Sequence, residues 1–189
     1  QSISPLADRS LDLQFPPGGF VQVNLEQNRQ LVAEVLTHAG KGGEVLDLYS
    51  GIGNFSLPIA RAARSVCGIE GFAPAVKAAK GNALRSNIGN ARFRVAEAGK
   101  GLRSAWTGGG FDTVVLDPPR AGAFEVVKQL AKLKLETIIY VSCDPMTLSR
   151  DLQHLLQNGY RPKALRPFDM FPQTFHIEGV VVLEQKGDG

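Results

Sequence analysis

The stretch from Thr137 to Pro145, Thr-Ile-Ile-Tyr-Val-Ser-Cys-Asp-Pro, places a thiol where the chain is expected to change its structure. Its β-branched and aromatic residues predict a strand buried on both faces. Asp144 is a favoured N-cap and Pro145 suits the first helical position, so we expect a helix directly after Cys143. The N–H groups and dipole of a helix N-terminus favour the thiolate, the nucleophilic form of cysteine. Cys143 is therefore a candidate nucleophile, or else a small buried residue, as free cysteines usually are.

A second candidate site is the glycine-containing segment from Val45 to Ser56, which has the order strand, turn and helix start. Gly51 and Gly53 let the backbone approach a ligand at the carboxyl edge of a sheet. A dinucleotide site would have a third glycine where Ser56 stands, which disfavours an NAD-linked dehydrogenase. Glu70 ends the next predicted strand and is placed to accept hydrogen bonds from ribose hydroxyls. The pattern indicates a nucleoside ligand, although such turns also occur as plain tight packing.

The same turn resembles the first motif of S-adenosylmethionine-dependent methyltransferases. The matching residues are Asp47, Tyr49, Gly51, Gly53 and Phe55. In that motif the acid and the glycines flank the methionine part of the cofactor, and the acid of the second strand takes the ribose. The resemblance therefore implies a cofactor with a reactive methyl sulfonium.

A third candidate is Asp117, which is followed by two prolines and Arg120. This pattern predicts either a stiff turn that faces a substrate or a rigid loop with a capping acid. Methyltransferases that act on amino groups usually carry an aromatic residue after the prolines, where it stacks on the base. Arg120 at that position argues against exocyclic amines and leaves methylation at carbon open.

The remaining sequence predicts the elements that would position these residues. A helical pattern over 25–38 is followed by alternating strands and helices. Strands are predicted at 44–49, 65–70, 91–96, 111–116 and 137–142, with helices near 54–63, 72–87, 97–107, 122–133 and 145–157. This alternation indicates an α/β fold with a doubly wound, mostly parallel sheet. The runs Ala164–Met170 and Gly179–Gln185 have no helical pattern between them, so we expect an antiparallel pair at one side of the sheet.

Composition and length limit the classes of protein that fit. A chain of 189 residues with 43% hydrophobic content fits one domain with a sizeable core. Residues 1–24 are rich in Pro and Gly, and the segments 11–15 and 20–24 read as two short strands around a turn. We expect this segment to be the remnant of a preceding domain, with a catalytic domain over 25–189. The chain begins with Gln1, which suggests a fragment.

Several other classes of protein are disfavoured. Two cysteines, Cys67 and Cys143, cannot form a four-cysteine zinc or iron–sulfur site, so no metal is expected, and Cys67 is predicted to be core. No apolar run approaches the roughly 18 residues of a membrane span, and no signal segment opens the sequence, so a cytoplasmic protein is expected. The net charge of +3 permits an anionic partner such as RNA without proving it.

Three sets of residues together resemble one family. They are Phe20-Val-Gln-Val-Asn24, Leu116-Asp-Pro-Pro-Arg-Ala-Gly122, and Tyr140-Val-Ser-Cys-Asp-Pro145 with Phe171-Pro-Gln-Thr-Phe-His-Ile-Glu178. These segments are similar to the catalytic domain of RNA uracil-5-methyltransferases, which methylate uridine C5 in transfer or ribosomal RNA. Members typically carry an additional N-terminal RNA-binding domain of oligonucleotide-barrel type, and some carry cluster cysteines. Neither is found in this sequence.

The resemblance implies a Rossmann-like methyltransferase fold and a role for each matching residue. It makes Cys143 the nucleophile and Glu178 the base, although Glu178 would otherwise read as an ordinary acid at the start of a strand. The residues that it places at S-adenosylmethionine are Gln22, Tyr49, Gly51, Gly53, Asn54, Glu70 and Asp117. Glu97 falls where the adenine end of the cofactor is usually bound.

The chemistry of the family explains why these residue types are needed. Uracil C5 is a poor nucleophile, but a thiolate that adds to C6 makes an enolate with electron density at C5. After methylation a base must remove the C5 proton so that the cysteine can leave. The uracil must also leave its RNA stack. Arg120, Phe171 and Phe175 are candidates to line its pocket, although both aromatics also suit a core, and His176 is left as a structural or RNA-proximal residue.

Other interpretations stay open. A cytosine-C5 methyltransferase would use similar thiolate chemistry. The chain would alternatively be a module that binds S-adenosylmethionine but cannot hold RNA alone. Arg161, Lys163 and Arg166 form a loose basic stretch that suits either RNA phosphates or a solvated surface.

Overall fold

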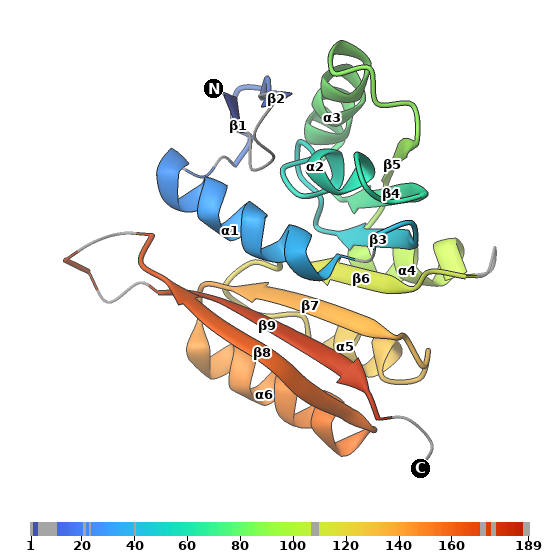
Figure 1. Cartoon of the computed structure of the whole chain (residues 1–189), viewed down its shortest axis with the longest axis vertical. Coiled ribbons are helices and arrows are strands. Elements are labelled where there is room, and N and C mark those ends of the chain that lie inside the picture. Colours follow the sequence, from blue (N-terminus) through green and yellow to red (C-terminus); the bar gives the residue numbers. More distant parts are fainter. Residues whose placement is uncertain are drawn as a thin grey trace.

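The computed structural model describes residues 2–3, 11–20, 22, 24–39, 41–106, 110–170, 173–174 and 177–186. Within these residues, the larger sheet has seven strands in the order β5-β4-β3-β6-β7-β9-β8 (Figure 1). Its parallel strands are β3 (Glu44–Leu48), β4 (Ser65–Glu70), β5 (Ala91–Val95), β6 (Thr113–Leu116) and β7 (Thr137–Ser142). The chain builds from β3 through β4 to β5 and then crosses back to β6. Ligands bind at the carboxyl ends of strands beside such a reversal.

The antiparallel end of the sheet brings the C-terminal part of the chain to the same edge. The strand β9 (Glu178–Gln185) pairs with β7, and β8 (Tyr160–Phe168) pairs with the outer side of β9. Ser142 is opposite Gly179 in this register. Because Cys143 follows Ser142 and Glu178 precedes Gly179, the two residues leave the sheet at the same end.

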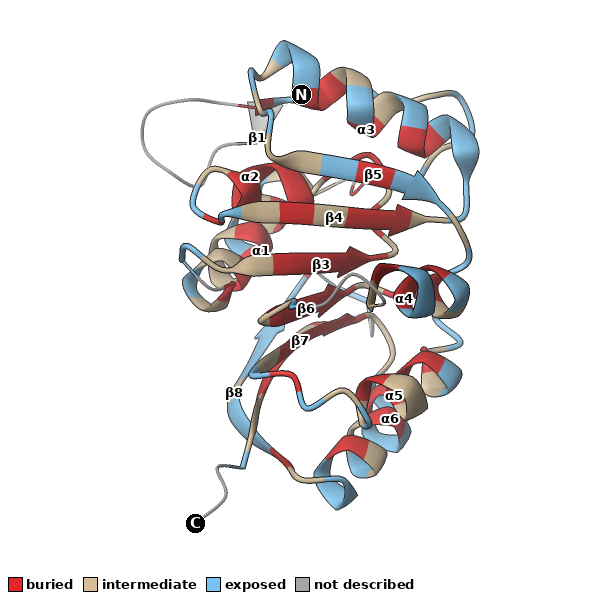
Figure 2. Ribbon diagram, turned by 90° about the vertical axis from the view of Figure 1, so that its right-hand side faces the viewer, coloured by how far each residue is buried: buried red, intermediate tan, exposed pale blue. Residues whose placement is uncertain are grey.

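Helices cover both faces of the sheet. One face carries α1 (Leu25–His38), α2 (Ser56–Ala60) and α3 (Ala73–Arg85), and the other carries α4 (Ala98–Trp106), α5 (Phe124–Leu130) and α6 (Pro145–Gln157). Figure 2 shows the buried strands between α1 and α2 on one side and α4, α5 and α6 on the other. The predicted fold class, α/β with a doubly wound, mostly parallel sheet and an antiparallel C-terminal pair, is therefore confirmed.

The two helix starts that frame the site are capped by side chains. Asp144 Oδ1 accepts hydrogen bonds from the backbone N–H groups of Met146 and Thr147, at 3.0 and 2.9 Å. The Asn24 side chain accepts from the N–H of Gln27 at the start of α1. The predicted start of α6 directly after Cys143 is thus confirmed, together with its cap.

Glycines diluted the pattern over 97–107, yet α4 forms there. A Cβ at Gly101 would lie 2.3 Å from Ile69 Cγ2, so this glycine lets the helix pack closely on β4. Other boundaries differ from the prediction. The helices expected at 54–63 and 122–133 are limited to 56–60 and 124–130, and the strand expected from 111 begins at 113. The strand expected from 164 begins at Tyr160, because its exposed polar residues lie on the edge of the sheet and hide the strand pattern.

The N-terminal segment differs most from the prediction. The first expected strand is reduced to β2 (Leu11–Asp12), which pairs with β1 (Ser2–Ile3) rather than with residues 20–24. Phe20, Gln22 and Asn24 lie outside any strand, and Val21 and Val23 lie outside the described residues. The second expected strand is therefore wrong at the described positions, because Gln22 faces a cavity and Asn24 caps a helix.

The segment nevertheless packs on the rest of the chain. Leu11 and Leu13 are buried in the core on the α1 side of the sheet. The backbone of Gln14 exchanges two hydrogen bonds with the Asn82 side chain of α3, at 2.9 and 3.0 Å. Whether residues 1–24 derive from a preceding domain stays a prediction.

Two further observations concern the described residues only. No helix among them is long and apolar enough to cross a membrane. No three His, Cys, Asp or Glu side chains in this part of the chain gather as a set of metal ligands.

Candidate active site

Cys143 and Glu178 line one cavity of about 320 Å³, at the lower end of the roughly 300–1,000 Å³ of small-molecule sites. Cys143 stands between β7 and α6, and Glu178 is the first residue of β9. The other lining residues are Phe20, Gln22, Arg120, Met170 and Ile177. The structure therefore brings the two predicted catalytic residues together from positions 35 apart in sequence.

Burial raises the pKa of the Cys143 thiol, and the nearby carboxylates of Glu178 and Asp117 raise it further. A hydrogen bond from the Arg120 side chain acts in the opposite direction and lowers this pKa. The lowered pKa expected from the helix N-terminus is therefore not found. Burial and the two carboxylates outweigh the helix N-terminus, whose first N–H groups already donate to the Asp144 carboxylate.

Burial also raises the pKa of the Glu178 carboxyl group. Glu178 is 7% exposed, and among the described residues its Oε2 has no hydrogen-bond partner. A buried carboxylate oxygen without a partner is costly, so such an atom indicates a place where a ligand or proton is received.

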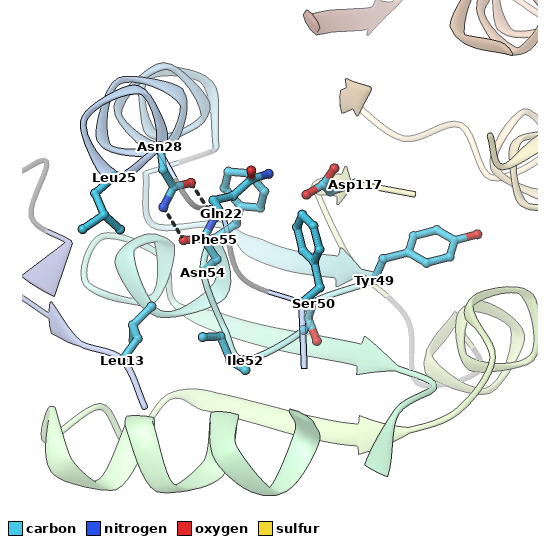
Figure 3. Close-up of a pocket in the computed structure, with 12 residues that line it drawn as sticks. Leu13, Gln22, Leu25, Asn28, Tyr49, Ser50, Ile52, Asn54, Phe55 and Asp117 are labelled. Atoms are coloured by element: carbon cyan, nitrogen blue, oxygen red, sulfur yellow. Dashed lines mark hydrogen bonds between the residues drawn. The ribbon is translucent and has the colours of Figure 1, made fainter. Parts of the chain in front are cut away.

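A second, narrower cavity lies over the turn that follows β3 (Figure 3). It shares Phe20 and Gln22 with the Cys143 cavity. Its other lining residues are Leu13, Leu25, Asn28, Tyr49, Ser50, Gly51, Ile52, Asn54, Phe55 and Asp117. Two adjacent cavities with a common wall suit two ligands that react with each other.

The turn after β3 has an unusual backbone conformation, and glycines occupy two of its three positions with positive φ. Tyr49, Gly51 and Gly53 have φ angles of 64°, 52° and 94°, in the left-handed region that favours glycine. A Cβ on Gly51 would meet no atom within 4 Å, whereas one on Gly53 would lie 2.9 Å from Leu57. Gly51 thus faces open space and Gly53 permits tight packing behind the turn. Strain of this kind in a non-glycine residue such as Tyr49 is typical of functional sites.

Glu70 fixes the turn to the end of β4. Its Oε2 accepts a hydrogen bond from the N–H of Gly51 at 3.1 Å, and its Oε1 accepts from the N–H of Phe72 at 2.7 Å. A carboxylate has about four lone-pair sites, so acceptors remain for hydroxyl groups of a ligand.

Two buried polar atoms have no hydrogen-bond partner among the described residues, Ser50 Oγ in this turn and Asp47 Oδ1 near the end of β3. The other oxygen of Asp47 accepts a short hydrogen bond from the Ser56 hydroxyl. Burial raises the pKa of Asp47 to about 7, against the lowering effect of the Ser56 bonds. Unsatisfied polar atoms next to a largely apolar cavity fit a ligand with both apolar and polar parts.

Asn28 of α1 holds Asn54 in place. Their side-chain amides exchange two hydrogen bonds, each 3.0 Å long (Figure 3). Asn24, which caps the same helix, donates to the carbonyl of Met170 at 3.1 Å and so ties α1 to the Cys143 cavity. One helix therefore supports the walls of both cavities.

Not every predicted site residue lies at a cavity. Gln22, Tyr49, Gly51, Asn54 and Asp117 line the second cavity, with Glu70 and Gly53 directly behind the turn. Glu97 lies apart from it, because its exposed side chain pairs with Lys100 at 2.8 Å. Phe171, Phe175 and His176 lie outside the described residues.

The loose basic stretch is paired with acids. Lys163 and Arg161 contact Glu184, and Arg166 contacts Glu34. Cys67 is half-buried in β4, where it packs beside the core on the α4 side of the sheet.

The sequence interpretation missed several cavity residues, among them Asn28, Ser50, Met170 and Ile177. Only Asn28 carried a usable signal. It lies three and four residues before Leu31 and Val32, on the buried face of α1, where an amide needs a specific partner.

The chain is similar to known proteins of one family. The family model described as tRNA (Uracil-5-)-methyltransferase matches residues 1–186. The chain is 48% identical over 179 residues to the 23S rRNA (uracil(1939)-C(5))-methyltransferase RlmD of Aeromonas hydrophila, covering 93% of this chain and 41% of that protein. It is 46% identical over 182 residues to RlmD of Pseudomonas fluorescens, covering 95% and 40%. The chain thus spans about two fifths of the length of these relatives.

Solved structures give the same result. The tRNA (uracil-54, C5)-methyltransferase of Pyrococcus abyssi, in complex with S-adenosyl-L-homocysteine, is 37% identical with a TM-score of 0.76, covering 88% of this chain and 40% of that one. Magnesium protoporphyrin IX methyltransferase from Synechocystis has a TM-score of 0.65 at 20% identity, covering 89% and 86%, and shares the fold alone. With a family model that matches nearly its whole length, the chain belongs to the tRNA (uracil-5-)-methyltransferase family.

Proposed function

We propose that this chain is the catalytic part of an enzyme that methylates uridine C5 in RNA with S-adenosylmethionine. The observation that carries the proposal is that Cys143 and Glu178 line one cavity, which shares a wall with a second cavity over the glycine turn. A cytoplasmic location stays a prediction.

The residues that line the second cavity suit the cofactor by their chemistry. Its apolar walls suit an adenosine, and the unpartnered Ser50 Oγ and the polar groups of Gln22, Asn54 and Asp117 provide hydrogen-bonding atoms. Glu70 keeps lone pairs for ribose hydroxyls beside Gly51. The cofactor would supply an electrophilic methyl group on a sulfonium. Glu97 stays a prediction for the adenine end, without support from the cavity.

Cys143 would activate the uracil. Its thiolate adds to C6, and the electron pair of the C5–C6 double bond moves toward C5, which becomes nucleophilic. Burial and two nearby carboxylates raise the pKa of the thiol. The hydrogen bond from Arg120 offsets this effect, because it favours the thiolate. The half-buried thiol borders the cavity that would receive the base.

Glu178 would complete the reaction. C5 would gain the methyl group as the S–CH3 bond breaks and S-adenosylhomocysteine leaves. C5 then still carries a proton, which Glu178 accepts as the electrons of that C–H bond restore the C5–C6 double bond. The C6–S bond breaks in the same elimination, and Cys143 leaves as a thiolate. A buried carboxylate with a raised pKa is a stronger base than an exposed one, and its Oε2 has an open position for the proton.

RNA is the proposed substrate because the relatives are named as enzymes of 23S rRNA or tRNA. A stacked uridine would have to swing out to reach a thiol at the sheet edge. The share of the relatives that the chain spans supports one alternative, a module that binds the cofactor but needs further protein to hold RNA.

The proposal is tested by incubation with S-adenosylmethionine and RNA containing 5-fluorouridine. Fluorine cannot leave as a proton, so a covalent protein–RNA product through Cys143 is expected on a denaturing gel. Cofactor binding by calorimetry without a product would favour the module. Release of 5-methylcytidine instead of 5-methyluridine from natural RNA would favour a cytosine enzyme.

A further inference from the structure

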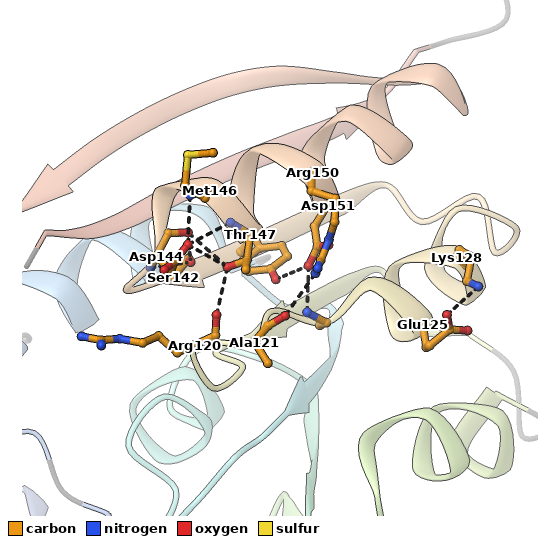
Figure 4. Close-up of polar contacts among 12 residues, drawn as sticks. Arg120, Ala121, Glu125, Lys128, Ser142, Asp144, Met146, Thr147, Arg150 and Asp151 are labelled. Carbon is orange, nitrogen blue, oxygen red and sulfur yellow. Dashed lines mark hydrogen bonds and ion pairs between the residues drawn. The ribbon is translucent and has the colours of Figure 1, made fainter.

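One face of α6 holds the turn of residues 117–123 that follows β6. Arg150 and Asp151 come three and four residues after Thr147, so both side chains lie on the same side of the helix as that of Thr147. Thr147 Oγ1 donates a hydrogen bond to the carbonyl of Arg120, and Arg150 Nη2 donates to the carbonyl of Ala121, each at 3.1 Å. Figure 4 shows these contacts between the helix and the turn.

Asp151 is the centre of this contact. It is fully buried, and its Oδ2 accepts hydrogen bonds from the Ala123 N–H and from the Tyr140 hydroxyl of β7, each at 2.7 Å. Its Oδ1 accepts from Arg150 Nε at 2.8 Å, which compensates the buried charge. One carboxylate thus joins α6, β7 and the end of the turn. The reaction as described above makes no use of it.

Gly122 shows how closely the helix and the turn approach. It has a φ of +75°, and a Cβ there would lie 2.7 Å from Arg150 Nη2 and 2.9 Å from Asp151 Oδ2. Its N–H also donates to the carbonyl of Pro119 at 2.8 Å, which closes the turn. Only glycine fits between the turn and the two side chains.

The contact joins two parts of the Cys143 cavity. Cys143 comes just before Asp144, the cap of α6, whereas Arg120 belongs to the turn. Both residues line the same cavity, and the Arg120 side chain hydrogen-bonds to the thiol. The charged groups that act on the thiol come from two further places, Glu178 at the start of β9 and Asp117 at the start of the turn. The distance between thiol and guanidinium therefore depends on how α6 holds the turn.

We propose that Asp151 is a positioning residue that holds the turn carrying Asp117 and Arg120 against the helix that follows Cys143. A catalytic role for Asp151 rests on the proposed function, because only a reactive cysteine needs a guanidinium held beside it. The positioning itself does not rest on that function. It requires only that loss of Asp151 moves Arg120 away from the Cys143 thiol.

The test measures alkylation of Cys143 by iodoacetamide as a function of pH, in the chain without RNA or cofactor. Mass spectrometry separates the Cys143 peptide from that of Cys67, which serves as an internal reference. With Asp151→Ala we expect the pH midpoint of Cys143 to rise and its alkylation at neutral pH to slow by about three- to tenfold, as the Arg120 bond to the thiolate is lost. If Asp151 acted only through its negative charge, its removal would favour the thiolate and lower the midpoint instead.

The double mutant separates positioning from other effects. Arg120→Ala should raise the midpoint as Asp151→Ala does, and the two substitutions together should add little to either alone, since both remove the same bond. Leu155→Ala is the matched control, because Leu155 is buried on the same helix but its aliphatic side chain forms no hydrogen bond to the turn. It should lower the melting temperature and leave the midpoint unchanged.

An unchanged or lowered midpoint in Asp151→Ala, or an additive double mutant, would overturn the proposal. If Asp151→Ala does not fold, Asp151→Asn takes its place. The asparagine keeps an oxygen for Ala123 and Tyr140 but turns an N–H group toward Arg150. We therefore expect a smaller rise of the pH midpoint than with Asp151→Ala. A midpoint equal to that of the wild type would contradict the proposal. Because no methyl transfer is measured, failure of the proposed function would leave this result intact.

Discussion

The two cavities of the site are assembled in different ways. The cavity over the glycine turn takes half of its lining from the seven residues 49–55, of which six contribute, and its shape follows from their local backbone. The Cys143 cavity takes its seven lining residues from four separate segments, at 20–22, 120, 143 and 170–178. The first therefore depends on local conformation, whereas the second depends on how the strands β6, β7 and β9 are placed. A substitution in the first cavity should therefore change ligand affinity, whereas a substitution in the second should change the rate of the reaction.

The sharpest test of this division is Cys143→Ala. It should remove the covalent product with 5-fluorouridine RNA and lower methyl transfer by about 10⁴-fold or more, as loss of a nucleophile does. Cofactor affinity, measured by calorimetry, should stay within about twofold, because Cys143 does not line the second cavity. The same covalent product from Cys143→Ala would show that another group is the nucleophile.

Glu178→Gln should separate the two halves of the reaction. Addition and methylation proceed, but the C5 proton stays, so a methylated adduct should accumulate with natural RNA while turnover falls by about 10²- to 10⁴-fold. Gel electrophoresis with labelled methyl groups would detect this adduct. Unchanged multiple turnover would exclude Glu178 as the sole base.

These two cavities also differ in how far the sequence predicts them. The strand, glycine turn and helix start at residues 45–56 encode a ligand site by local chemistry, and the cap at Asp144 encodes the start of α6. Glu178 has no local signal, since its neighbourhood depends on the antiparallel register that sets Gly179 opposite Ser142. Only the family resemblance pointed to it. The sequence also gives no sign of the raised pKa of Cys143, because it comes from burial in the folded chain and from Glu178 and Asp117, which are distant in sequence.

Asp47 should make the stability of the glycine turn depend on pH. Burial raises the pKa of this group from 3.8 to about 7 in the folded chain, so the folded state binds the proton more tightly than the unfolded state. The free energy of unfolding should therefore fall as pH rises between these values, by up to about 4 kcal/mol. Asp47→Asn should remove this dependence. Urea unfolding at about pH 5 and about pH 8, on either side of the pKa of about 7, measures this dependence. The free energy of unfolding should differ less between the two pH values in the variant than in the wild type.

Gly53→Ala should show that the turn needs its backbone conformation. Alanine at a φ of 94° is strained and its Cβ would lie 2.9 Å from Leu57, so a loss of about 2 to 4 kcal/mol in the free energy of unfolding is expected. Gly42→Ala is the control, because Gly42 has a φ of 76° but no atom within 4 Å of its Cβ. It should lose only about 1 to 2 kcal/mol. Equal losses would mean that the contact with Leu57 relaxes freely.

The smallest expected effect tests whether α1 supports the cofactor cavity through Asn28. In Asn28→Ala the Asn54 amide loses both hydrogen bonds to its partner, so its orientation is no longer fixed. We expect calorimetry to show about three- to tenfold weaker binding of S-adenosylmethionine, with little change in alkylation of Cys143. Asn90→Ala is the matched control, because the Asn90 amide also donates to buried backbone, the carbonyls of Ala60 and Ala63, but lies outside both cavities. It should lower stability without changing affinity. If the two variants weakened binding equally, the amide pair would act only through general stability, and local conformation of residues 49–55 would suffice for the cavity.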